Sequence, residues 1–167
     1  MLARFHSVAL VGIEAFPCEV EVDVAARGFE KASIVGLPDA AVKESLERIQ
    51  SALANCGYEF PRNRVTVSLA PADLKKEGPA FDLPIALGAV FANGLGTPER
   101  AGQYLVAGEL ALDGRVRPIR GSLSMAMLAK AEGFAGLLVP RENAEEAAVV
   151  QDVQVIPVSS LTEAVGF

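Results

Sequence analysis

The sequence predicts a single domain with an α/β fold, built as α+β layers. With 167 residues the chain can bury one substantial core, and a second folded domain would be cramped. Apolar residues make up 51% of the chain and aromatic residues only 6%, so Val, Leu, Ile and Ala must build that core. Strand-like segments fill the first third, and strands alternate with helices afterwards, which is typical of a layered domain.

The first third predicts an antiparallel meander of three strands. Residues 18–24, CEVEVDV, alternate valines with acidic side chains, the pattern of a sheet with one wet face. Shorter strands are expected over residues 7–13 and 32–37, because Gly and Pro separate these apolar segments.

Two helices are expected in the middle of the chain, separated by a strand over residues 64–69 and a polar loop. The first helix covers residues 38–57, because Pro38 and Asp39 suit a helix start and Gly57 suits its end. The second begins near Phe81 or Asp82, because its proline is tolerated only in the first turn. That second helix is apolar on nearly every side and should be buried. The first helix presents an apolar stripe of Val42, Leu46, Ile49 and Leu53.

The last third predicts a hairpin followed by alternating helices and strands. Residues 104–108 and 115–119 bracket an Asp-Gly pair, a strong hairpin signal, and the loop over 94–102 before them is expected to be a solvated excursion. A helix over 123–132 and a strand over 136–140 should follow. Asn143 and Glu146 then resemble a capping box at the start of another helix, and a strand and a short helix end the sequence.

Charge and residue usage exclude several classes of function. The formal net charge is −6, so the chain alone should be repelled by phosphate backbones unless its cations cluster. Cys18, Cys56 and the single His6 predict neither a zinc site nor a disulfide framework, and all three are expected to be packing or surface residues. No apolar run approaches the ~20 residues that cross a bilayer, and we expect a cytoplasmic protein.

Two charged segments are candidates for partner or ligand contacts. Lys75, Lys76 and Glu77 lead to a helix start, where a charged loop can hold an anion, although a solvated loop explains them too. Asp82 is expected to cap the buried helix through backbone N–H groups. The second segment is a local basic patch of Arg115, Arg117 and Arg120, which an ion-paired sheet surface explains equally well.

Residues 76–88, KEGPAFDLPIALG, and residues 108–121, GELALDGRVRPIRG, resemble the Lon family of Ser/Lys peptidases. The resemblance places the nucleophilic serine at Ala80 and the activating lysine at Met125. Alanine has no hydroxyl and methionine has no basic nitrogen, so the catalytic pair is absent at these positions. A Lon-like ATP-dependent peptidase with displaced residues remains the alternative, because Ser122, Ser124 and Lys130 lie nearby in the sequence.

Longer blocks, IVGLPDAAVKES at residues 34–45 and GYEFPRNRVTVSLAPADLKKEG at 57–78, extend the resemblance to the whole chain. Together the blocks resemble the N-terminal domain of the ComM/YifB family of magnesium-chelatase-like AAA+ ATPases. This implies a ribosomal protein S5 domain 2-like fold, as in Lon peptidase domains, over residues 1–167 as one ChlI-type domain. A AAA+ ATPase module, with ATP and Mg as its cofactors, would follow residue 167. No phosphate-binding G-x-x-x-x-G-K-[ST] motif occurs in this chain.

The resemblance further implies a non-catalytic accessory or assembly domain in DNA processing, namely branch migration of DNA during natural transformation. Its partners would be its own AAA+ module, neighbouring subunits of a hexamer, and DNA only through the full-length assembly. A free-standing small-ligand domain is a third class of function, and a closed polar pocket would identify it.

Overall fold

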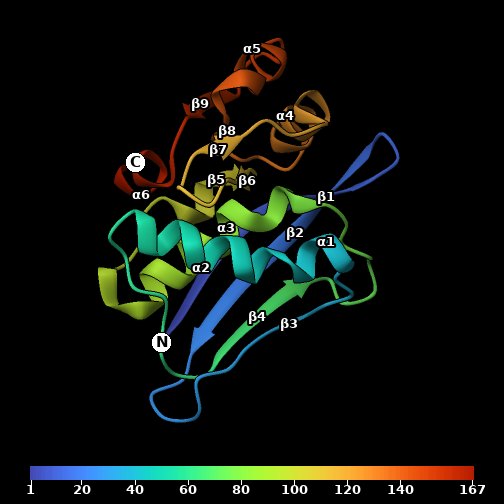
Figure 1. Cartoon of the computed structure of the whole chain (residues 1–167). Coiled ribbons are helices and arrows are strands. Elements are labelled where there is room, and N and C mark those ends of the chain that lie inside the picture. Colours follow the sequence, from blue (N-terminus) through green and yellow to red (C-terminus); the bar gives the residue numbers. More distant parts are fainter.

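A computed structural model describes residues 1–167 as one mixed seven-stranded sheet with helices packed against it (Figure 1). The strand order is β3-β4-β2-β1-β5-β8-β9, and β6 and β7 form a separate two-stranded sheet. This arrangement confirms the predicted α/β layered fold. The strands are β1 Leu2–Val11, β2 Glu14–Val24, β3 Ala32–Val35, β4 Val65–Ala70, β5 Tyr104–Val106, β6 Glu109–Leu110, β7 Val116–Arg117, β8 Gly136–Pro140 and β9 Gln154–Val158.

Six α-helices connect these strands, together with short 3-10 and π turns. None of the helices is both long and apolar enough to traverse a lipid bilayer. The α-helices are α1 Ala40–Lys43, α2 Ser45–Asn55, α3 Asp82–Val90, α4 Ser122–Ala131, α5 Ala144–Ala147 and α6 Leu161–Gly166.

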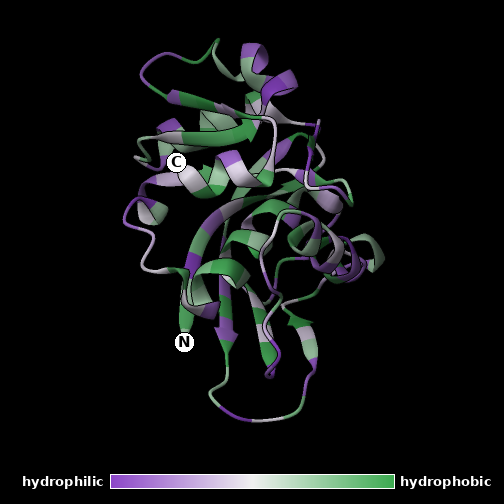
Figure 2. Ribbon diagram, turned by 60° about the vertical axis from the view of Figure 1, so that its left-hand side comes forward, coloured by the Kyte–Doolittle hydropathy of each residue, from purple (hydrophilic) through white to green (hydrophobic).

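The long hairpin of β1 and β2 confirms the predicted alternation of apolar and acidic residues. Val20, Val22 and Val24 are buried, whereas Glu19 and Glu21, which alternate with them, are half-buried. Figure 2 shows the same alternation as bands of hydrophilic and hydrophobic colour along the strands. Because successive side chains point to opposite faces, the valines pack against the helices and the acids face water.

The predicted meander is wrong at its third strand. β3 pairs with β4 in parallel, from Ala32 opposite Val65 to Val35 opposite Ser68, and β4 lies between β3 and β2. The physical reason is the helical segment of α1 and α2 between β3 and β4. A parallel pair needs such a crossover, whereas a meander needs only tight turns.

The first predicted helix is divided into α1 and α2, which meet at Glu44. Asp39 is the N-cap, with its carboxylate accepting the Val42 N–H at 2.8 Å. Pro38 therefore precedes the helix and does not occupy its first turn. Of the predicted stripe, three members are buried and Leu46 is half-buried.

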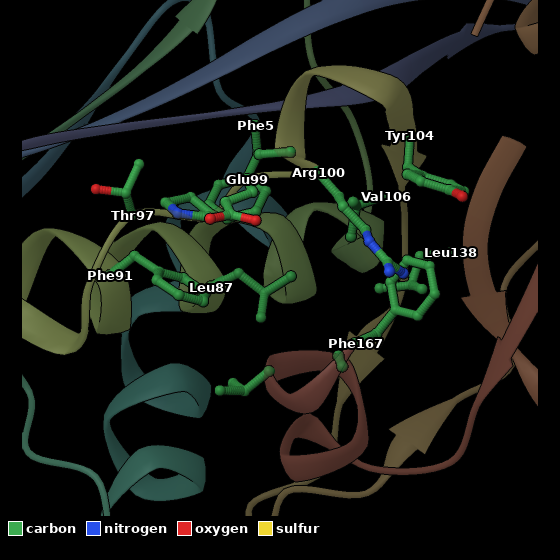
Figure 3. A pocket seen from close by; sticks show the side chains of 14 residues that line it. Phe5, Leu87, Phe91, Thr97, Glu99, Arg100, Tyr104, Val106, Leu138 and Phe167 are labelled. Carbon is green, nitrogen blue, oxygen red and sulfur yellow. The ribbon is translucent and has the colours of Figure 1, made fainter. Parts of the chain in front are cut away.

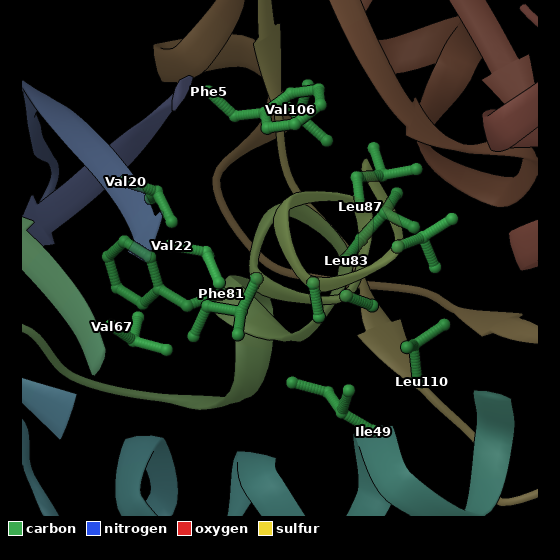
Figure 4. Close-up of a cluster of buried hydrophobic side chains, with 14 of the residues drawn as sticks. Phe5, Val20, Val22, Ile49, Val67, Phe81, Leu83, Leu87, Val106 and Leu110 are labelled. Carbon is green, nitrogen blue, oxygen red and sulfur yellow. The ribbon is translucent and has the colours of Figure 1, made fainter. Parts of the chain in front are cut away.

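α3 is the buried centre of the domain, as its sequence predicted. All nine of its residues are buried, between the valines of β2 on one side and α2 on the other (Figure 4). Gly88 permits this close approach, because a Cβ there would lie 2.4 Å from Val22 Cγ2.

The hairpin prediction is correct in its turn and wrong in one of its strands. The turn at Asp113 and Gly114 joins β6 to β7, whereas β5 lies in the main sheet between β1 and β8. All three residues of β5 are buried, because parallel neighbours flank it on both sides. A continuous apolar segment such as β5 is typical of a buried parallel strand and not of a solvated hairpin.

The predicted capping box at Asn143 and Glu146 is also wrong. The Asn143 side-chain amide exchanges two hydrogen bonds with the Ile119 backbone, at 2.9 and 2.8 Å. Glu146 Oε1 accepts the Leu123 N–H at 3.2 Å, near the start of α4. Both side chains therefore hold the segment that leads into α4, a partner 20 or more residues away in the sequence. The helix predicted over 123–132 is confirmed as α4, and the remaining strands and helix are confirmed as β8, β9 and α6.

Candidate functional site

Ala80 and Met125 lie at the starts of two different helical segments, and both residues pack into one apolar cluster. Ala80 belongs to the 3-10 turn Pro79–Phe81, which leads into α3, and Met125 ends the first turn of α4. Met125 is a member of the cluster and Ala80 packs against its edge. The buried members are Val8, Leu105, Ala107, Met125, Ala126, Ala129, Leu137, Val139 and Ala147.

Backbone hydrogen bonds tie the first Lon-like block to the second. The Gly108 N–H donates to the Ala80 carbonyl at 2.9 Å, and the Leu83 N–H donates to the Gly108 carbonyl at 3.0 Å. The fold therefore brings together the two segments that carry the resemblance. That Ala80 and Met125 hold the Ser and Lys positions stays a prediction.

The side chains of Ala80 and Met125 cannot perform acyl transfer. Nucleophilic catalysis needs a hydroxyl or thiol with a base in hydrogen-bond reach, and neither Ala80 nor Met125 supplies one. Met125 is only 1% exposed, which makes it a packing residue. The chemistry available at this point is burial of apolar surface.

The serines nearest to this region donate to backbone carbonyls. Ser122 is buried and its hydroxyl donates to the Asn143 carbonyl at 3.3 Å. The Ser124 hydroxyl donates to the Ile13 carbonyl at 3.1 Å, at the tip of the β1–β2 hairpin. Lys130 is exposed on α4 and bonds neither hydroxyl. This geometry gives no support to a displaced Ser/Lys pair.

An ion pair between the half-buried Arg48 and the fully buried Asp82 connects α2 with α3, and the sequence did not reveal it. Asp82 is fully buried, with Oδ2 at 2.7 Å from Arg48 Nε and Oδ1 at 3.0 Å from Arg48 Nη2. Asp82 Oδ2 also accepts the Leu110 N–H of β6 at 3.0 Å. The hydrogen bond to Asp82 raises the pKa of Arg48.

These contacts correct the expectation that Asp82 caps its own helix, because its carboxylate bonds two other elements and none of the N–H groups of α3. Arg48 also pairs with the exposed Glu44 at 3.7 Å, a longer contact than its 2.7 Å bond to Asp82. The available signal was the lone carboxylate on an otherwise apolar helix, since a buried charge requires a partner.

The structure separates the three charged residues at positions 75–77. Lys75 and Glu77 are exposed and pair with each other at 3.6 Å. Lys76 is fully buried, its ammonium donates to the Pro71 carbonyl, and burial lowers its pKa. The expected solvated loop is therefore wrong at Lys76, whose backbone bonds Leu37 and Asp39 in a short ladder.

An internal carboxylate already occupies the helix-start amide that an anion would need. The Gly78 N–H donates to Asp39 Oδ2 at 3.1 Å, while the other oxygen of Asp39 caps α1. A bound anion would meet this negative charge. A contact role for Lys75 and Glu77 with a partner stays a prediction.

The predicted basic patch is smaller than expected. Arg115 pairs with Asp113 at 2.9 Å, while Arg117 and Arg120 are exposed and have no carboxylate within 4.0 Å. Only Arg117 belongs to β7, because the strand ends there.

A surface cavity of about 340 Å³ lies between α3, α6 and the loop that follows residue 96 (Figure 3). The Arg100 guanidinium lies 4.8 Å from the centre of the Phe167 ring, and Tyr104 contacts the same ring edge-on at 5.2 Å. The loop predicted to be a solvated excursion thus forms a wall of the cavity through Thr97 and Pro98. Ten of the 14 lining residues are hydrophobic, so this is not the closed polar pocket of a small-ligand domain.

The remaining candidates are packing residues, as expected. His6 is half-buried with its ring 5.4 Å from that of Phe134. Cys18 is a buried free thiol and Cys56 a half-buried one. Burial raises the pKa of Cys18 to about 11, which keeps its sulfur protonated and unreactive at neutral pH.

Comparison with known proteins gives the family. The family model described as subunit ChlI of Mg-chelatase matches residues 20–143, well over half of the chain. The chain belongs to the ChlI family.

Within this family the chain is 39% identical to YifB of Escherichia coli over 149 residues, 89% of this chain and 29% of that protein. It is 38% identical to the competence protein ComM of Haemophilus influenzae over 166 residues, 99% of this chain and 32% of that protein. The chain therefore spans about a third of the length of these curated relatives. A more distant relative is the Lon protease of Azorhizobium caulinodans, 28% identical over 148 residues, 81% of this chain and 17% of that protein.

Proposed function

We propose that this chain is a non-catalytic accessory or assembly domain of a cytoplasmic, ComM-like AAA+ ATPase that processes DNA. The observation that carries the proposal is the pair of Ala80 and Met125. Both residues lie at helix starts on one apolar cluster, where the Lon-like resemblance requires a nucleophile and a base. On this proposal the domain keeps the scaffold of a peptidase site and lacks the atoms that perform peptidase chemistry.

The relatives support the DNA-processing part of the proposal. ComM is named a competence protein, and 99% of this chain matches 32% of that protein. We infer a contribution to branch migration of DNA in natural transformation, driven by a AAA+ module outside this chain. ATP and Mg would bind that module, because these 167 residues contain no phosphate-cradling lysine motif.

The packing of the domain suits a role as a rigid connector. The Arg48–Asp82 ion pair joins α2, α3 and β6, and α3 is buried along its whole length. Such a body can transmit force or orient neighbouring subunits with little internal rearrangement. Its partners would be its own AAA+ module and the adjacent subunits of a hexamer.

The test begins with the gene. The coding sequence beyond Phe167 should encode a G-x-x-x-x-G-K-[ST] motif, and its absence would contradict the proposal. The full-length protein should then be compared with a variant lacking residues 1–167, by mass photometry and by ATPase rate. We expect the deletion to weaken hexamer formation or to uncouple ATP hydrolysis from DNA, while unchanged assembly and coupling would exclude an accessory role.

The chain by itself should not bind nucleotide. A calorimetric titration with Mg-ATP is expected to show no saturable binding at micromolar concentration. Saturable binding would place a nucleotide site within these residues and would require a different function.

A further inference from the structure

Two loops project together from the end of the sheet at which β2 ends and β4 begins (Figure 1). They are residues 25–31, between β2 and β3, and residues 58–64, between α2 and β4. The Ala25 N–H donates to the Arg64 carbonyl at 2.9 Å, and the Val65 N–H donates to the Lys31 carbonyl at 2.8 Å. These bonds hold the loops side by side, and each joins residues more than 30 positions apart in the sequence.

The two loops carry a local excess of positive charge on an acidic protein. Arg27, Lys31 and Arg64 are exposed and have no carboxylate oxygen within 4.0 Å. Arg62 has Glu59 at 3.9 Å, and both side chains are more than three-quarters exposed, so water and salt screen that pair. The other carboxylates at this end belong to Glu30, on the first loop, and Asp23, which lies 3.9 Å from the N-terminal amine.

The first loop also carries an exposed aromatic side chain, between two of these cations in the sequence. Phe29 is 91% exposed, and it lies two residues from Arg27 on one side and two from Lys31 on the other. An exposed phenyl ring among cations is the combination that binds unpaired bases, because the cations contact phosphates while the ring stacks on a base.

We propose that the Phe29 surface, made of Arg27, Phe29, Lys31, Arg62 and Arg64, binds single-stranded nucleic acid. The proposal rests on the proposed function in DNA processing and names the strand contact made by this domain. A duplex keeps its base faces stacked and offers no partner to Phe29. Phe29 is the only large apolar residue exposed on these loops, so insertion into a lipid surface would also have to use Met1 and Leu2, which are exposed at the same end of the sheet.

The experiment is a fluorescence anisotropy titration of this chain against labelled oligo(dT) of about 20 nucleotides. Because the whole chain is acidic, we expect a dissociation constant of about 10⁻⁴ M near physiological salt. Four phosphate contacts on a single strand predict a salt slope of about −3, so affinity should rise about 50-fold when salt falls from about 200 to about 50 mM.

Two kinds of variant separate the contributions of charge and stacking. The double variant Arg27→Glu with Arg64→Glu should abolish binding at low salt. Phe29→Ala should weaken binding about fivefold or more and leave the salt slope unchanged, while Phe29→Tyr should restore affinity. The control is Arg117→Glu with Arg120→Glu, which makes the same charge change on exposed arginines elsewhere and should leave affinity nearly unaltered.

Several results would overturn the proposal. They are absence of saturable binding at low salt, equal weakening by the control variant, tighter binding to duplex than to oligo(dT), and binding to phosphatidylserine vesicles in place of oligo(dT). The measurement of hexamer assembly on the full-length protein does not depend on this surface. Absence of oligo(dT) binding therefore leaves the accessory-domain proposal standing. Conversely, oligo(dT) binding by this chain does not support the accessory-domain proposal if the deletion leaves assembly unchanged.

Discussion

Asp82, fully buried at the start of α3, accepts two hydrogen bonds from the Arg48 guanidinium of α2 and a third from the Leu110 N–H. A buried carboxylate without its partner keeps its desolvation cost and loses the attraction that offsets it. The pair is therefore a point at which a single change should weaken the whole domain.

Replacing Arg48 by Met should lower the free energy of unfolding by about 3 to 5 kcal/mol, because Asp82 would remain buried and unpaired. Urea denaturation followed by circular dichroism measures this change. The matched control is Arg115→Met, which breaks the exposed pair with Asp113 and should cost no more than about 1 kcal/mol. Equal costs for the two variants would show that the buried pair has no special role.

Gly88→Ala should destabilise the protein by about 1 to 3 kcal/mol, although alanine normally favours a helix. The added Cβ would lie 2.4 Å from Val22 Cγ2, and Val22 is fully buried and cannot move aside cheaply. Thermal unfolding provides the measurement. Gly102→Ala, where no atom lies within 4 Å of the new Cβ, is the control and should be nearly neutral. A stable Gly88→Ala protein would mean that α3 sits further from the sheet.

Stability should fall between about pH 9 and pH 11 through Cys18. Burial raises the pKa of this thiol from 9.0 to about 11, so the folded state keeps a proton that the unfolded state releases. The contribution is fully present below pH 9, is lost as pH rises toward 11, and amounts to about 2 to 3 kcal/mol.

Urea unfolding of the wild type and of Cys18→Ala at several alkaline pH values tests this prediction. The difference in stability between the two proteins should shrink steadily across that interval. The buried Lys76, whose pKa is lowered, acts in the opposite direction but is present in both proteins. If the difference in unfolding free energy between the two proteins stays constant from pH 9 to 11, the raised pKa of Cys18 is contradicted.

The chain should not react with serine-directed fluorophosphonate probes and should not cleave casein. Ala80→Ser combined with Met125→Lys should not restore peptidase activity, because oxyanion donors and substrate positioning are separate requirements. The lysine would also enter a site that is only 1% exposed, which destabilises the protein. Peptidase activity in the unmodified chain, abolished by Ser122→Ala or Ser124→Ala, would revive the displaced-dyad alternative.

Local patterns in the sequence determined much of the architecture. The alternation in β2 and the apolar sequence of α3 are both local patterns, because each depends only on residues that are close in the sequence. A period of two predicts a strand with one buried face, and a helix that is apolar on nearly every side is predicted to be buried. The expectation that Ala80 and Met125 stand in place of a serine and a lysine also came from residue type within the family blocks, and it stays a prediction. The family itself follows from the same blocks.

Tertiary structure alone decided the partners of the polar side chains. Arg48 meets Asp82 across 34 positions, and Asn143 bonds the Ile119 backbone in preference to capping its own helix. Lys76 lies in a charged segment that is typical of the surface, but it is buried beside the Leu37–Asp39 segment, which bonds its backbone. A hydrogen-bonding side chain has many possible partners, and only the packing of distant elements determines which of them lies within about 3 Å.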